Sequence, residues 1–115
     1  RNAKTKCKYL IVGVHSNECA HTYKRIPILT MEERASVVEA CRFVDQVVIN
    51  APVIITNDYL DNLKVDKVFH CHSLEDDEKY NYMYKNVLER FERLEYTDTI
   101  STTNIINRIK DRYTN

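Results

Sequence analysis

The apolar residues of this chain gather into short runs that predict β-strands. Residues 9–14 and 47–49 are unbroken apolar runs, which are typical of strands covered on both faces. A third strand is expected at residues 67–70, and a weaker fourth strand near residues 94–96.

Helical patterns separate these strands. Thr30 and Glu33 have the spacing of a capping box, in which the two side chains satisfy free backbone N–H groups at a helix start. The helix behind this box is expected to carry Met31, Ala35, Val38 and Cys41 on its apolar face. Thr56 or Asn57 is expected to cap a short helix over residues 58–64.

Three other segments have weaker patterns. Basic residues 1–8 are compatible with the end of a helix, residues 15–25 are expected to form a polar loop, and the acidic, tyrosine-rich residues 75–93 are expected to be partly helical.

Strands that alternate with helices predict an α/β fold, with a Rossmann-like parallel sheet, right-handed crossovers and flanking helices. Ligands of such folds bind beyond the carboxyl ends of the strands. The loops expected at that edge are residues 15–25, 70–74 and 97–102.

The last helix is expected to begin within residues 100–109. Ser101 or Thr102 can cap it, and its apolar face would carry Ile105, Ile106, Ile109 and Tyr113. A capped helix start behind a strand can also bind an anion, because free N–H groups, hydroxyls and the positive end of the helix dipole converge there. The structural alternative is an ordinary capped helix.

Length and composition limit the classes of protein to consider. At 115 residues the chain is expected to form a single domain, and 17 basic residues balanced by 17 acidic ones do not favour a nucleic-acid partner. No apolar run approaches the roughly 20 residues of a membrane span. The four cysteines are interpreted as reduced thiols of a cytoplasmic protein. The only glycine, Gly13, excludes a glycine-rich phosphate loop.

Several motifs resemble the choline- and ethanolamine-phosphate cytidylyltransferases. The run Cys-Arg-Phe-Val-Asp-Gln-Val-Val at residues 41–48, with Ala51-Pro52 after it, is similar to the family's core signature. Ile-Ser-Thr-Thr at residues 100–103 resembles its C-terminal signature. The resemblance covers nearly the whole chain, and its pattern is most similar to the second cytidylyltransferase-like domain of the ethanolamine enzymes.

The resemblance implies an enzyme domain of the nucleotidyltransferase type. It would transfer CMP from CTP, with Mg²⁺, to phosphoethanolamine, giving CDP-ethanolamine and pyrophosphate in phospholipid synthesis. The domain would work as a homodimer or paired with a second similar domain. Lys24 would act as the catalytic lysine, and no side chain is assigned to a resident metal. The residues implied to bind nucleotide are His70, Cys71, His72, Ser73, Thr97, Asp98, Thr99, Ile100, Ser101 and Thr102.

The sequence also departs from the family pattern. The catalytic His-x-Gly-His, which in the family follows the first strand, does not occur, so the first strand and most of the first helix are expected to be absent and residues 1–115 to be an N-terminally incomplete domain. Tyr96 and Thr99 stand where the family has arginine and glycine. The resemblance therefore leaves open a catalytically degenerate binding or regulatory domain, or the phosphocholine-specific enzyme.

A zinc-binding module is a further alternative. His70, Cys71 and His72, with Cys19 or His21, have suitable ligand chemistry. Adjacent residues of a strand point to opposite faces, however, and no regular pair spacing supports such a site.

Overall fold

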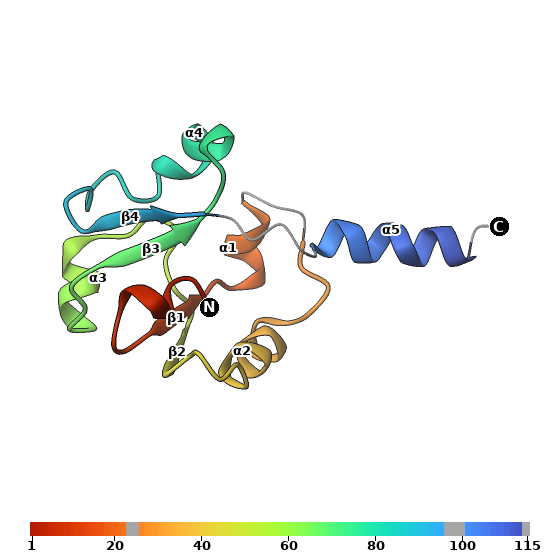
Figure 1. The fold of residues 1–115 in the computed structure, drawn as a ribbon, viewed down its shortest axis with the longest axis horizontal. Coiled ribbons are helices and arrows are strands. Elements are labelled where there is room, and N and C mark those ends of the chain that lie inside the picture. Colours follow the sequence, from red (N-terminus) through yellow and green to blue (C-terminus); the bar gives the residue numbers. More distant parts are fainter. Residues whose placement is uncertain (23–25, 96–100, 114–115) are drawn as a thin grey trace.

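A computed structural model describes residues 1–22, 26–95 and 101–113. Figure 1 shows a body of short strands and helices, from which the last helix projects. The elements in chain order are the 3₁₀ helix η1 (Lys4–Lys6), β1 (Ile11–Val14), α1 (Asn17–His21), α2 (Met31–Glu39), β2 (Gln46–Ile49), α3 (Asn57–Asn62), β3 (Val68–Cys71), η2 (Leu74–Asp76), α4 (Asp77–Asn81), β4 (Phe91–Leu94) and α5 (Thr102–Tyr113).

The predicted α/β class and the parallel pairing are confirmed, but the strands do not form one sheet. β1 pairs in parallel with β2, and β3 pairs in parallel with β4, as two separate two-stranded sheets. The expectation of strands buried on both faces is wrong for the same reason. In β1 only Val14 is buried, and β2 has no buried residue. In the described part of the chain each of these strands pairs along one edge only, and so small a sheet leaves much of its faces exposed.

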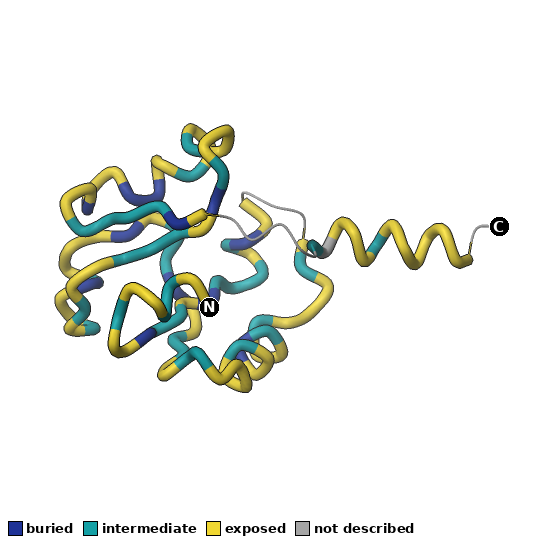
Figure 2. The backbone as a smooth tube through the Cα atoms, in the orientation of Figure 1, coloured by how far each residue is buried: buried dark blue, intermediate teal, exposed yellow. Residues whose placement is uncertain are grey.

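Each half has its own small apolar core. Around β3 and β4 the core consists of Ile55, Leu60, Met83, Tyr84 and Val87. Around β1 and β2 the buried side chains are smaller, namely Leu10, Val14, Ala20, Ala35 and Ala51. Figure 2 shows buried segments in both halves of the body, whereas α5 is exposed along most of its length.

Capping side chains set where the helices α2 and α3 begin. The Thr30 hydroxyl accepts a hydrogen bond from the Glu33 N–H (3.1 Å), and the Glu33 carboxylate accepts one from the Thr30 N–H (2.9 Å), so the capping box is confirmed. Thr56 caps α3 by accepting from the Tyr59 N–H (3.2 Å). Cys41, placed on the α2 face by its spacing, lies beyond the helix end and is exposed, because Ala40 is the C-cap.

Three other expectations need correction. Residues 15–25 are not simply a loop, because Ser16 accepts from the Cys19 N–H (3.1 Å) and caps the short helix α1. The fourth strand lies at Phe91–Leu94, three residues before the expected start, where the strand pairs with β3. Of residues 1–8, only Lys4–Lys6 form a turn of 3₁₀ helix.

Candidate nucleotide site

The candidate site lies beyond the carboxyl ends of the strands. Figure 1 shows β3 and β4 pointing toward the side of the body from which α5 leaves, and α1 follows β1 directly. The loops after β1, β3 and β4 are those that the sequence predicted for a ligand. Lys24, Tyr96 and the four predicted residues 97–100 lie outside the described residues, so their predicted roles stay predictions.

Ser101 is the N-cap of the final helix. Its hydroxyl oxygen accepts a hydrogen bond from the Asn104 N–H (3.1 Å), and its carbonyl accepts one from the Ile105 N–H (3.1 Å). The predicted cap is therefore confirmed at Ser101, with Thr102 as the first helical residue. The Ser101 O–H can still donate to a ligand, because a hydroxyl has one donor beside its acceptor lone pairs.

His70 and His72 form a linked pair at the end of β3. Their Nδ1 atoms lie 2.8 Å apart, and the Nε2 of His72 lies 2.6 Å from the Asp77 carboxylate. The carboxylate is an acceptor, so Nε2 of His72 carries hydrogen, and the Nδ1 of a neutral His72 accepts from the Nδ1–H of His70. His72 is almost fully buried, with 2% of its surface exposed. The arrangement fixes the orientation of the His70 ring.

Neighbouring groups hold this histidine pair. Arg93 donates to the carbonyl of His72 (2.9 Å), and its Nε lies 3.8 Å from the Asp77 carboxylate. The ring of Tyr80 packs against both imidazoles, at centroid distances of 4.6 Å from His70 and 5.3 Å from His72. The end of β3, the end of β4 and the start of α4 are thereby joined in one rigid cluster.

The two other predicted residues of this loop are more accessible. Cys71 is exposed, and the Ser73 hydroxyl donates to the Asp76 carboxylate (3.2 Å). Among residues 1–22, 26–95 and 101–113, no three His, Cys, Asp or Glu side chains are grouped so that they could hold a metal ion. The zinc alternative therefore gains no support from the described part of the chain.

Arg34 lies at the edge of the candidate site, and the sequence analysis did not single it out. Its Nη2 donates to the carbonyl of His15 (2.7 Å) and to the side-chain oxygen of Asn17 (2.7 Å), so it holds the segment that follows β1. Its buried Nε has no hydrogen-bond partner among the described residues. The contact joins residues 17 and 19 positions apart, which no local pattern could reveal.

Comparison with known proteins matches the chain to a family pattern and to several curated relatives. The sequence pattern of the cytidylyltransferase-like family matches residues 1–108. Human choline-phosphate cytidylyltransferase A is 38% identical over 112 residues, which cover 91% of this chain and 29% of that protein. The ethanolamine-phosphate cytidylyltransferase of Dictyostelium discoideum is 33% identical over 121 residues, covering 96% and 32%. Its mouse counterpart is 34% identical over 111 residues, covering 95% and 28%.

The chain thus spans about 30% of the length of these relatives, with 29%, 32% and 28% covered. No helix in the described ranges is long and apolar enough to cross a membrane. Because the family pattern covers nearly the whole chain, the chain belongs to the cytidylyltransferase-like family.

Proposed function

We propose that this chain is part of an ethanolamine-phosphate cytidylyltransferase. A phosphate oxygen of phosphoethanolamine would attack the α-phosphorus of CTP, while the bond from that phosphorus to the β-phosphate oxygen breaks. CDP-ethanolamine forms, and pyrophosphate leaves with the electron pair of the broken bond. The observation that carries the proposal is the family match over residues 1–108, which ends in the Ser101-capped helix.

The protein's part in this reaction is positioning and charge neutralisation. Ser101 and Thr102, with the N-terminus of α5, would hold phosphate oxygens, and Lys24 would reach the β- and γ-phosphates as a compact point charge. Residues 70–73 and 97–100 would line the base and the ribose. Mg²⁺ would arrive with CTP as part of the substrate, bound by phosphate oxygens, and would offset part of their charge.

The clustered rings at the site edge favour ethanolamine over choline. A quaternary ammonium is best recognised by the open faces of several aromatic rings. At the site edge, the ring of Tyr80 is instead packed against His70 (4.6 Å between centroids). A primary ammonium needs hydrogen-bond acceptors more than an aromatic cage, and it is the substrate that we propose.

The proposal also covers the cellular compartment and the assembly of the protein. The four unpaired thiols support a reducing, cytoplasmic environment. Pairing with a second copy or with a second similar domain is supported by the exposed apolar side chains of α5, since Ile109 is 54% and Tyr113 78% exposed.

A degenerate domain that binds nucleotide without turnover is the second candidate. Tyr96 replaces the family's arginine, which removes a fork-shaped phosphate ligand. An assay of the whole protein with labelled CTP separates the two. Formation of CDP-ethanolamine in excess over CDP-choline supports the proposal, whereas CTP binding without either product supports the degenerate domain.

A further inference from the structure

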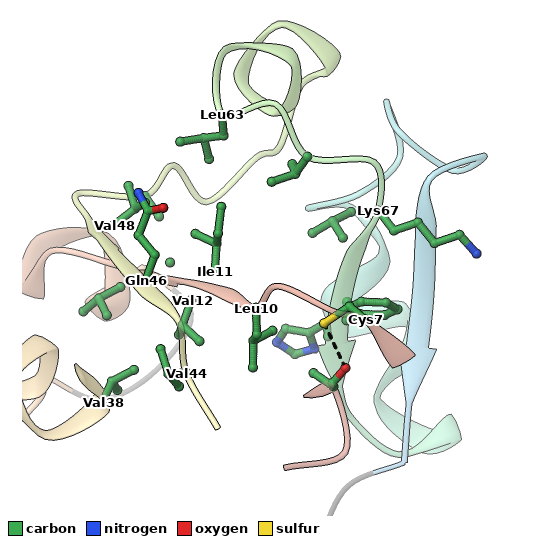
Figure 3. Close-up of a pocket in the computed structure, with 18 of the residues that line it drawn as sticks. Cys7, Leu10, Ile11, Val12, Val38, Val44, Gln46, Val48, Leu63 and Lys67 are labelled. Carbon is green, nitrogen blue, oxygen red and sulfur yellow. Dashed lines mark hydrogen bonds between the residues drawn. The ribbon is translucent and has the colours of Figure 1, made fainter. Parts of the chain in front are cut away.

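His70 and His72 lie on the same side of the chain at the end of β3, but their surroundings differ. Residues two positions apart along a strand point to the same face, and the two imidazoles meet there. His70 is half-buried and lines a groove of about 1240 Å³ between the two sheets. Figure 3 shows Leu10 and Ile11 at this groove. His72 is 2% exposed and is not among the described residues that line the groove.

Both ring nitrogens of His72 are already engaged. Its Nδ1 lies 2.8 Å from the Nδ1 of His70, and its Nε2 lies 2.6 Å from the Asp77 carboxylate. An imidazole ring has no further polar atom. The side chain of His72 therefore has no polar atom left for a nucleotide, and its route to the candidate site runs through His70.

The contact between the two Nδ1 atoms holds one hydrogen, because one atom must donate and the other must accept. The ionised Asp77 only accepts, so the Nε2 of His72 keeps its hydrogen. In the neutral array the shared hydrogen therefore belongs to His70, whose Nε2 carries none. Uptake of one proton leaves one hydrogen between the rings and adds the new hydrogen at the Nε2 of His70. A single proton thus changes this atom from an acceptor to a donor.

Neighbouring elements hold the array in place. Arg93 of β4 has its Nε 3.8 Å from the Asp77 carboxylate and fixes that group beside the buried imidazole. The ring of Tyr80, from α4, packs on both imidazoles. The ring of Tyr84 lies 5.7 Å from that of His70 between centroids. The packed rings restrict turning of the imidazoles, so a change at Asp77 is transmitted along the array.

We propose that Asp77 and His72 are positioning residues, which act on the candidate site through His70. The array sets the orientation of the His70 ring, and one proton decides whether its Nε2 accepts or donates. Asp77 begins α4, so the start of this helix takes part in the site without touching the ligand. The part of the inference that concerns nucleotide rests on the proposed function, which makes His70 a nucleotide-lining residue.

The hydrogens on the two rings give the first test, and they need no ligand. Long-range nitrogen–proton NMR of the full chain with isotope-labelled histidine shows which ring nitrogens carry hydrogen, and His70→Gln and His72→Gln assign the signals. In mildly alkaline buffer we expect hydrogen on the Nδ1 of His70 and on the Nε2 of His72. As the pH falls, the Nε2 of His70 should gain hydrogen while one hydrogen stays shared by the two Nδ1 atoms. Independent titration of the rings, or hydrogen on the opposite pair of nitrogens, overturns the proposal.

Asp77→Asn gives the second test. The amide has the shape of the carboxylate but can donate as well as accept, so it should admit the opposite pair of ring forms. CTP affinity should fall about 2- to 10-fold, the range for one neutral hydrogen bond. Glu78→Gln is the matched control, because it removes the same charge from an exposed position of α4 and should change neither the ring forms nor the affinity. Parental ring forms and parental CTP affinity in Asp77→Asn would contradict the proposal.

Failure of this inference can be told from failure of the proposed function. If the parent chain does not bind CTP, the proposed function fails, and the ring forms of the parent still decide about the array. If the parent binds CTP and Asp77→Asn changes the ring forms without changing the affinity, His70 does not act on the nucleotide and the positioning role is refuted. If Asp77→Asn does not fold, the ring forms of the parent decide alone, because they need no change at Asp77.

Discussion

Replacing Ser101 separates helix capping from phosphate binding. The hydroxyl oxygen of Ser101 accepts the Asn104 N–H at 3.1 Å, and a lost cap destabilises a helix by about 1 kcal/mol. A hydroxyl that also donates to a charged phosphate contributes roughly 1.5–3 kcal/mol of binding, which corresponds to about a 10- to 150-fold change in affinity. Ser101→Ala should therefore weaken CTP binding by that factor and also loosen α5.

Two companion variants make the test sharper. Ser101→Gly keeps the cap to within a few tenths of a kcal/mol but removes the donor, so it should lose CTP affinity while α5 stays formed. Ser101→Asp caps as well as serine does, but its carboxylate repels a triphosphate, so it should bind CTP most weakly of all. Calorimetric titration with CTP gives the affinity of each variant.

The effect of a lost Ser101 cap on the stability of α5 is measured by amide exchange within that helix. α5 is largely exposed, with Ile105 at 45% and Ile109 at 54%, so cap loss should appear as faster amide exchange in α5 more than as a lower melting temperature. Thr56→Ala is the matched control, because it removes the cap of α3 (Thr56 hydroxyl to Tyr59 N–H, 3.2 Å) and should leave CTP affinity unchanged. If Ser101→Asp binds CTP as tightly as the parent chain, Ser101 is a cap only and the phosphate site lies elsewhere.

Three further changes have distinct expected outcomes. Lys24→Ala should weaken CTP binding more than CMP binding in paired titrations, because the lost contact is with the β- and γ-phosphates; equal losses would place Lys24 elsewhere. Tyr96→Arg should tighten CTP binding by restoring a fork-shaped phosphate ligand, and an unchanged affinity would contradict that role. The hydrogen bonds from Lys4 (2.5 Å) and then from the Leu10 N–H (2.7 Å) hold the pKa of Asp45 below its ordinary value. Its stabilisation is therefore full above the ordinary aspartate pKa and is lost as pH falls through the lowered one. Asp45→Asn should flatten the acid side of the stability profile measured by urea unfolding, and an unaltered profile would contradict this.

Local features of the fold could be read from the sequence because their causes are local. The Thr30–Glu33 box and the Ser101 cap each join residues three positions apart, and both formed as predicted. The fourth strand was harder to find, because Phe91–Leu94 overlaps the tyrosine-rich residues 75–93 that were expected to be partly helical. The strand is defined by its pairing with β3. The division into two sheets was not predicted, because apolar runs indicate strands without specifying which edges meet.

The candidate site depends on contacts that local patterns do not contain. The loops predicted to bind a ligand follow β1, β3 and β4 in the chain, and their role stays a prediction. The pairing of His72 with Asp77 and of Arg34 with His15 depends on tertiary structure. The family resemblance supplied Lys24 and residues 97–100, and their roles remain predictions. The spacing of residues along the sequence indicates which loops can bind a ligand. The orientation of each side chain is set by contacts with residues far away in the sequence.

Product binding tests the central claim most directly. The protein is titrated calorimetrically with CDP-ethanolamine, CDP-choline and UDP, with identical buffer and Mg²⁺ in each titration. Recognition of both the cytidine nucleotide and a primary ammonium predicts that CDP-ethanolamine binds most tightly, CDP-choline more weakly and UDP weakest. Equal binding of all three ligands, or tighter binding of CDP-choline, would contradict the assignment to an ethanolamine-phosphate cytidylyltransferase.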